Sequence, residues 1–143
     1  MRVASNGKKV YSVDMMFAYI RLKKLRAIKL PISSIHFDTS AKCWPHGKTE
    51  ISPDQVLKNP KKYAVDYSRI ENADLRFPII MNSGYIYDGV HRFIKAKRDN
   101  RKFIAVYEFD NRLLERFLIN KTGDFEPQLE IHDYIELFNK KFP

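Results

Sequence analysis

The sequence is poor in cysteine and contains no long uncharged segment. Its 143 residues include a single cysteine, Cys43, which excludes an intramolecular disulfide framework and a multi-cysteine zinc ribbon. A lone cysteine is typical of an intracellular chain, so we expect a cytoplasmic protein. No uncharged stretch reaches the roughly 18 residues of a membrane span, and residues 1–10 contain no apolar run after their charges. We therefore expect neither a membrane segment nor a secretion signal.

Acidic residues are scarce relative to basic ones. The chain has 26 Lys and Arg against 17 Asp and Glu, a formal net charge of +9 with the four histidines neutral. This excess favours an anionic partner, although nucleotide phosphates, nucleic acid and simple solubility all account for it. Ten Phe and eight Tyr, within a hydrophobic fraction of 44%, suffice for a folded core and exclude a disordered basic tail. The length fits one domain over 1–143 and leaves the oligomeric state open.

Local patterns in the first half predict two helical regions separated by a strand and a loop. Asp14 is the expected N-cap of a basic helix that reaches toward Pro31, because apolar residues recur there at helical spacing. Alternating residues over 32–38 predict a short strand, and 39–49 reads as a loop. Helices then follow from a Ser-Pro start to an Asn-Pro stop and beyond it, over 52–58 and 61–73.

The most regular part of the chain follows residue 76. An Asn-Ser-Gly turn between two apolar runs predicts a β-hairpin, which is followed by a helix and a closing strand: 77–81 with 85–88, then 90–98, then 102–109. Two further helices are predicted over 113–120 and 129–140. We therefore expect an α+β fold, a small mixed sheet flanked by helices, with a core over about 32–109 and helical additions over 14–30 and 113–140.

The junction between the hairpin and the following helix combines groups that bind anions. Asp88 ends the strand, Gly89 occupies the bend, and His91 and Arg92 belong to the first helical turn. Backbone N–H groups at a helix start, including that of Val90, favour phosphate, and a glycine allows phosphate to approach closely. Arg92 could hold phosphate oxygens bidentately while His91 donates another hydrogen bond. Asp88 could orient them, bind Mg²⁺ or take a proton. Alternatively, Asp88 is an N-cap beside a solvated His-Arg pair.

Residues 77–81, the turn, the Asp-Gly-Val-His-Arg box and the strand over 103–107 together resemble the core of the ParB/sulfiredoxin superfamily. The resemblance implies a ParB/sulfiredoxin-like fold whose box binds nucleotide phosphates: ATP in sulfiredoxin and the free-serine kinases, and CTP in the ParB partition proteins. Val90 occupies the position of the sulfiredoxin catalytic cysteine, which argues against sulfiredoxin activity. The chain after residue 109 is too short for the helix-turn-helix domain of the partition proteins, whose box is also of a Gly-Glu-Arg-Arg type.

The box resembles that of the free-serine-kinase branch most, because Asp88 precedes the glycine and a His-Arg pair follows it. The resemblance implies a phosphotransferase or NTPase that uses ATP or another NTP with Mg²⁺. Its substrate would be a hydroxyl-bearing small molecule or a nucleic-acid-linked group. The alternative function is a DNA-binding ParB-like module, with or without nuclease activity, that lacks kinase activity.

The resemblance also indicates positions outside the box. Ser68 and Arg69 correspond to phosphate-facing residues on the helix before the Pro-Ile strand, although Arg69 could instead form a surface ion pair with Asp66 or Glu71. Phosphoryl transfer needs a carboxylate for the Mg-NTP and for the acceptor. Asp88 is the candidate that the motif places, and Asp74 and Glu50 are others.

The loop over 39–49 carries a separate candidate site. Cys43, His36 and His46 could bind a metal, but their spacing matches no established pattern and a fourth ligand is not evident. Trp44 could stack on a base or substrate, although a tryptophan beside proline is more often a packing anchor.

Overall fold

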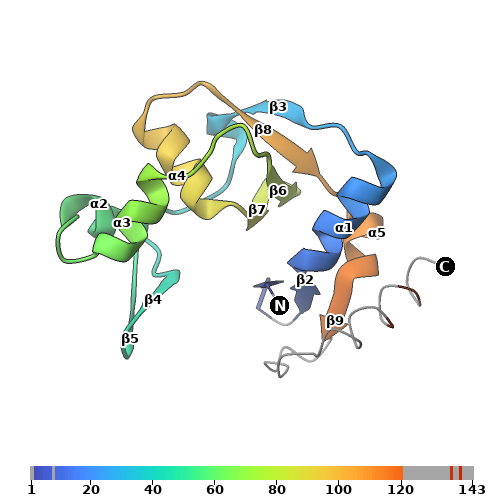
Figure 1. Ribbon diagram of the computed structural model, residues 1–143, viewed down its shortest axis with the longest axis horizontal. Coiled ribbons are helices and arrows are strands. Elements are labelled where there is room, and N and C mark those ends of the chain that lie inside the picture. The colour runs from blue at the N-terminus through green and yellow to red at the C-terminus, as the bar shows by residue number, and fades with distance from the viewer. Residues whose placement is uncertain (1, 8, 121–135, 137–138, 140–143) are drawn as a thin grey trace.

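A four-stranded mixed sheet lies at the centre of the protein in the computed structural model, which describes residues 2–7, 9–120, 136 and 139 (Figure 1). Its strand order is β3 (Ile28–Pro31), β8 (Phe103–Glu108), β6 (Ile79–Asn82) and β7 (Tyr85–Asp88). β3 runs antiparallel to β8, β8 parallel to β6, and β6 antiparallel to β7. The helix α4 (Val90–Arg98) connects β7 to β8. The architecture is therefore α+β, as expected.

The β6–β7 hairpin confirms the turn predicted from Asn-Ser-Gly. Ser83 and Gly84 both have positive φ values, 49° and 85°, as a two-residue hairpin turn of the primed type requires. At Gly84 a Cβ would collide with the His36 imidazole. The backbone N–H of His36 donates to the Gly84 carbonyl at 2.8 Å. The turn thus also holds the backbone at residue 36 against the hairpin.

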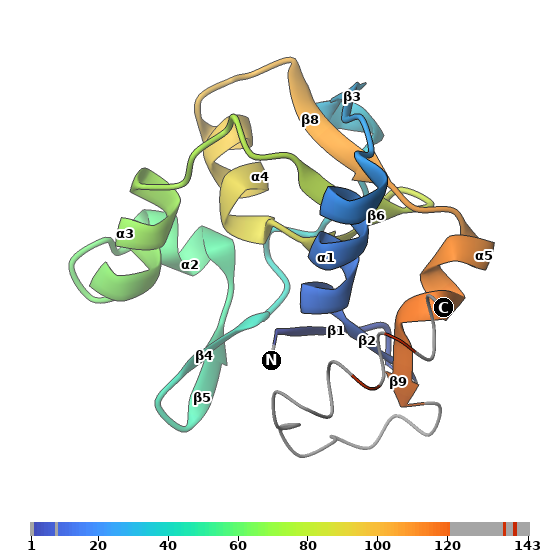
Figure 2. The same cartoon turned by 45° about the vertical axis from the view of Figure 1, so that its right-hand side comes forward.

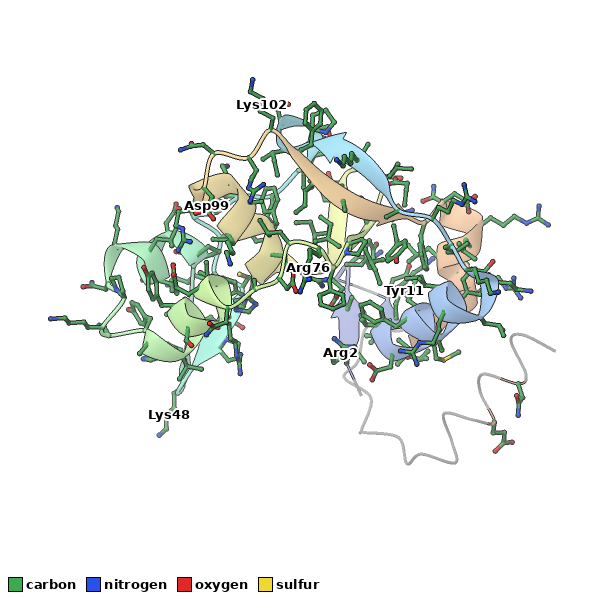
Figure 3. All side chains as sticks on the ribbon, turned by 45° about the horizontal axis from the view of Figure 1, so that its top comes forward. Arg2, Tyr11, Lys48, Arg76, Asp99 and Lys102 are labelled. Carbon is green, nitrogen blue, oxygen red and sulfur yellow. The ribbon has the colours of Figure 1, made fainter. Side chains whose placement is uncertain are left out.

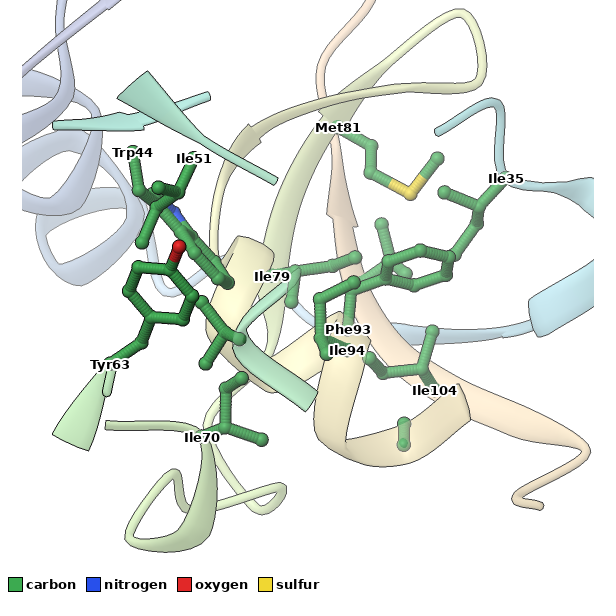
Figure 4. Close-up of a cluster of buried hydrophobic side chains, with 13 residues drawn as sticks. Ile35, Trp44, Ile51, Tyr63, Ile70, Ile79, Met81, Phe93, Ile94 and Ile104 are labelled. Atoms are coloured by element: carbon green, nitrogen blue, oxygen red, sulfur yellow. The ribbon is translucent and has the colours of Figure 1, made fainter. Parts of the chain in front are cut away.

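Adjacent residues of β6 contribute to two different cores. Ile79 and Met81 join the first core, whereas Ile80 between them joins the second, because successive side chains of a strand point to opposite faces. The first core also contains side chains from α4 and from α2 (Pro53–Lys58), α3 (Ala64–Glu71), β4 (Trp44–His46) and β5 (Thr49–Ile51) (Figure 4).

The second core lies on the other side of the sheet, under the N-terminal and C-terminal elements (Figure 2). The helix α1 (Val13–Lys23) packs there with α5 (Asn111–Leu114) and with the 3₁₀ turn η2 (Glu115–Phe117). A three-stranded antiparallel sheet completes this side, in the order β1 (Val3–Ser5), β2 (Val10–Ser12) and β9 (Leu118–Asn120). Residues of α1 and of α3 line a cleft between the two cores.

The predicted helix start at Ser52 is confirmed. The Ser52 hydroxyl accepts a hydrogen bond from the Gln55 N–H at 3.2 Å, and the Gln55 side chain accepts one from the Ser52 N–H at 2.9 Å. This reciprocal capping box is a local device, with Pro53 at the first helical position, so the sequence alone could specify it. The second predicted helix is shorter than 61–73, because α3 covers Ala64–Glu71.

The prediction for residues 14–38 was wrong in three places. Ser12, not Asp14, caps α1, since its hydroxyl accepts from the Met15 N–H at 3.2 Å. The helix ends at Lys23, and the strand β3 then takes the residues before Pro31, because they pair in register with β8. The segment 32–38, predicted as a strand, instead opens with the 3₁₀ turn η1 (Ile32–Ser34). The distant partner β8, invisible to local patterns, decides the difference.

Two other segments differ from prediction. The loop predicted over 39–49 contains β4 and the start of β5, which form a two-stranded hairpin. The helix predicted over 113–120 is reduced to α5 and η2, and β9 follows because its residues pair with β2. The helix predicted over 129–140 lies outside the described residues, except for 136 and 139. Among the described residues, no helix is long and apolar enough to cross a membrane.

Candidate anion-binding cleft

The predicted box forms a sharp strand-to-helix junction. β7 ends at Asp88, Gly89 adopts a left-handed conformation with φ of 104°, and α4 begins at Val90 without any side-chain cap. A Cβ at Gly89 would lie 2.5 Å from Cγ2 of Ile79 and 3.0 Å from Nη2 of Arg92. Glycine is required here both for the backbone conformation and for the contact with β6.

Arg92 is held by three acceptors inside the protein. Its Nη2 donates to Oδ2 of Asp88 at 2.6 Å, and its Nη1 donates to the carbonyls of Phe77 and Pro78 at 3.1 and 3.0 Å. Only 17% of each side chain of the Arg92–Asp88 pair is exposed. Asp88 therefore orients Arg92 and does not cap α4, and Arg92 fastens α4 to the segment before β6.

His91 is held between a carboxylate and an indole. Its Nε2 lies 3.0 Å from Oδ1 of Asp66, and its ring stacks on Trp44 at a centroid distance of 4.2 Å and an interplanar angle of 6°. An ionised carboxylate only accepts hydrogen bonds, so Nε2 carries a proton in this pair. Nδ1 of a neutral His91 is then an acceptor, and His91 donates a second hydrogen bond to an anion only as the imidazolium.

Burial lowers the pKa of His91, and the hydrogen bond to Asp66 opposes this shift only in part. The folded state therefore binds its proton less tightly than the unfolded chain, whose histidine pKa is about 6.5. The contribution of His91 to the free energy of unfolding is therefore fully present above about pH 6.5. It decreases as the pH falls toward the folded-state pKa, because the unfolded chain takes up the proton first. We expect the free energy of unfolding, measured in urea, to fall more between pH 7.5 and pH 5.0 for the wild-type protein than for His91→Gln. Equal losses would contradict this account.

A basic cleft of about 930 Å³ opens where the first turn of α4 faces α1 and α3. Its lining includes His91 and five cationic side chains that come from four separate parts of the chain: Arg2, Arg21, Lys24, Arg69 and Arg92. Arg2 is paired with Asp14 at 3.1 Å and Arg92 with Asp88 at 2.6 Å. No described acidic residue lies within 4 Å of the charged groups of Arg21 and Lys24, and Arg69 reaches Asp66 only at 3.8 Å. These three cations are available to a bound anion.

The rest of the cleft lining is largely apolar. It includes Phe17, Ile20, Leu25 and Tyr107, which belong to or pack against the second core, and Phe77 and Pro78, which precede β6. Asp74 is the carboxylate in this lining among the described residues, and its hydrogen bonds from Arg76, at 2.7 to 3.1 Å, hold its pKa at about 2. The cleft therefore combines apolar walls with an excess of positive charge, which suits an anionic ligand that has a flat apolar part.

The structure brings together only part of the site predicted from the sequence. His91, Arg92 and Arg69 line the cleft, whereas Ser68 accepts a hydrogen bond from the Asn72 amide at 3.0 Å and lies outside the lining. Gly89, Val90, Asp88 and Glu50 are also outside the lining.

Sequence reasoning missed the contribution of Arg2, Arg21 and Lys24 to this cleft. The available signal was the basic run on the first helix, which charge patterning alone could not distinguish from a solvated face.

The metal-binding alternative near residue 43 is not supported. Among the described residues no group of three or more His, Cys, Asp or Glu side chains is placed to hold a metal ion. His36 packs on Tyr85 at 5.5 Å, and His46 packs on Tyr63 at 4.9 Å, so they belong to different contacts. Although Cys43 as a residue is exposed, partial burial of its thiol raises the pKa of that thiol to about 11. The reactive thiolate is therefore scarce at neutral pH.

Comparison of this chain with protein-family models, with curated proteins and with solved structures finds no match.

Proposed function

We propose that the protein binds the phosphate groups of a nucleoside triphosphate in the cleft at the start of α4 and, with Mg²⁺, transfers a phosphoryl group to a hydroxyl. The observation that carries the proposal is the set of cations that line the apolar-walled cleft together with Arg92. Arg21 and Lys24 have no acidic partner among the described residues, and Arg69 contacts Asp66 only at 3.8 Å. Guanidinium groups bind phosphate oxygens bidentately, and aromatic walls suit a nucleobase. The resemblance of the box to nucleotide-binding relatives points to the same ligand.

The residues of the cleft have distinct roles in this proposal. Arg69 and Arg21 contact phosphate oxygens directly, and Arg92, held in place by Asp88, adds positive charge at the helix start. A magnesium ion bound with the nucleotide would neutralise phosphate charge and would need one carboxylate of the protein to hold it. Asp88 is the carboxylate that the motif indicates, and Asp74 is the one in the described lining.

Titration calorimetry with ATP, CTP and GTP in the presence of Mg²⁺ tests the binding step. We expect micromolar affinity for at least one of them, weakened about 10- to 100-fold in Arg69→Ala, because a charge-assisted hydrogen bond contributes about 1.5–3 kcal/mol. Arg69 suits the test because 64% of its side chain is exposed, so its removal leaves the fold intact. Arg26→Ala is the matched control, since Arg26 is exposed and outside the lining.

Absence of heat with every nucleotide, or an equal loss in the Arg26 variant, would refute the proposal. Formation of ADP or another nucleoside diphosphate in the same samples distinguishes a phosphotransferase or NTPase from a binding protein. The alternative function, a DNA-binding module that holds a backbone phosphate at the same cleft, predicts instead binding to DNA with a steep dependence on salt.

A further inference from the structure

A second basic surface lies at the end of the central sheet, where α4 leads into β8. We define the β8-end patch as four exposed cationic residues and one exposed aromatic residue: Lys29, Lys97, Arg101, Lys102 and Phe103. Lys29 lies on β3 and Phe103 on the adjacent β8, and the register pairs Lys29 with Ala105, two residues from Phe103. Lys29 and Phe103 therefore belong to the same face of the sheet.

The cations of the β8-end patch have no acidic partner among the residues that the structure describes. No described carboxylate lies within 4 Å of Lys29, Lys97, Arg101 or Lys102, whereas the neighbouring Arg98 pairs with both Glu71 and Asp99. Lys95, one turn away, is also satisfied, since its Nζ donates to the carbonyls of Glu71 and Ala73 at 2.8 Å. Glu71 and Asp99 are thus engaged by other residues, and within the described part of the chain the four patch cations have no carboxylate partner.

Phe103 lies between two hollows in this surface. It is 56% exposed and lines both of them, together with Arg101 and Lys102. Lys29 completes the lining of one hollow and Lys97 that of the other, and neither hollow has an acidic residue among its described lining. A polymeric ligand that alternates negatively charged groups with planar rings would therefore contact both the cations and the Phe103 ring.

We propose that the β8-end patch binds single-stranded nucleic acid. The cations contact successive backbone phosphates, and an unstacked base lies on the Phe103 ring, which is the usual combination in proteins that bind single strands. Duplex DNA offers phosphates without a free base face, and an acidic peptide offers charge without a planar ring. A single strand therefore uses both features of this surface.

The patch is independent of the nucleotide cleft. The described linings of the cleft and of the two hollows at Phe103 share no residue. Figure 3 shows Lys102 at one end of the molecule and Lys48, in the turn between β4 and β5, at the opposite end. Lys48 and the exposed Lys61 therefore supply a control for net charge, because neither is part of the patch or of the cleft.

Fluorescence anisotropy with a labelled oligothymidylate of about 20 nucleotides tests the proposal at low salt. We expect Lys97→Glu/Lys102→Glu to weaken binding at least about tenfold and to flatten its salt dependence, since two phosphate contacts are lost. Phe103→Ala should weaken binding about tenfold with little change in salt dependence, because it removes stacking and no charge. Lys48→Glu/Lys61→Glu should change binding far less, and all three variants should bind the nucleotide as the wild type does.

Several outcomes would overturn the assignment. These are no binding of the oligonucleotide, an equal loss in the Lys48/Lys61 variant, an unchanged affinity in Phe103→Ala, or equally effective competition by polyglutamate. A larger loss in Arg21→Glu/Lys24→Glu than in the patch variant would place the strand in the cleft instead. Failure of nucleotide binding alone leaves this result unaffected, so the two proposals are separately tested.

Discussion

Replacing Gly89 with alanine is expected to destabilise the protein by about 2–4 kcal/mol. The left-handed backbone disfavours any side chain, and the added Cβ would lie 2.9 Å from Cβ of Ile79 in addition to the 2.5 Å contact with its Cγ2. Ile79 is fully buried in the first core and cannot move aside without shifting β6. Urea unfolding followed by circular dichroism measures the loss.

Gly47→Ala is the matched control for this prediction. Gly47 also has a positive φ, 60°, but its added Cβ would meet no atom within 4 Å. We therefore expect a cost of about 1 kcal/mol from backbone strain alone. The difference between the two variants measures the collision at the box together with the added strain of the larger φ of Gly89, 104°. If Gly47→Ala proved as destabilising as Gly89→Ala, the close packing of the box against β6 would be wrong.

Replacing Arg92 with methionine is expected to cost about 3 kcal/mol of stability in the absence of any ligand. The substitution keeps the aliphatic stem but leaves the Asp88 carboxylate and the carbonyls of Phe77 and Pro78 without their donor. Removing one partner of a largely buried pair leaves an uncompensated charge, which costs more than the pair itself contributes. Thermal and urea unfolding measure this loss.

The accompanying control is Arg69→Met. Arg69 is mostly exposed and reaches Asp66 only at 3.8 Å, so its loss should change stability by less than about 1 kcal/mol. Combining Arg92→Met with Asp88→Asn should recover part of the loss, because the remaining side chain is then uncharged. Strictly additive effects would show that Asp88 and Arg92 do not act as a pair. Together these variants measure the structural role of Arg92 apart from the positive charge that it is proposed to add at the helix start.

The elements that the sequence predicts correctly are those whose conformation is determined by residues close together in the chain. Ser52 and Gln55 cap α2 reciprocally within four residues, and the turn at Ser83 and Gly84 needs only its own backbone conformation. The junction at Gly89 belongs to the same class, since the residue type and the change of periodicity coincide. These features depend on neighbours in the chain, so reading the chain is enough to find them.

The elements that escape prediction depend on distant partners. Ile28 to Pro31 form a strand because β8 pairs with them, although their own composition continues a basic helix. The Trp44–His91 stack likewise needs the β4–β5 hairpin, which reads as a loop. The cleft has the same origin, because Arg21 and Arg69 meet only through tertiary packing. The sequence thus indicates the box, but not Arg21 and Lys24, which line the cleft together with it.

The pairing of Ile28 with Val106 also has a kinetic consequence. This contact closes a loop that contains most of the first core and the entire box, whereas β6, β7, α4 and β8 follow one another directly along the chain. Loop-closure entropy makes such a long-range pair costly to form before the intervening chain is organised. The edge strand β3 is therefore the late component of the sheet. The box can acquire its shape early in folding, and the face that combines Lys29 with Phe103 exists only once folding is nearly complete.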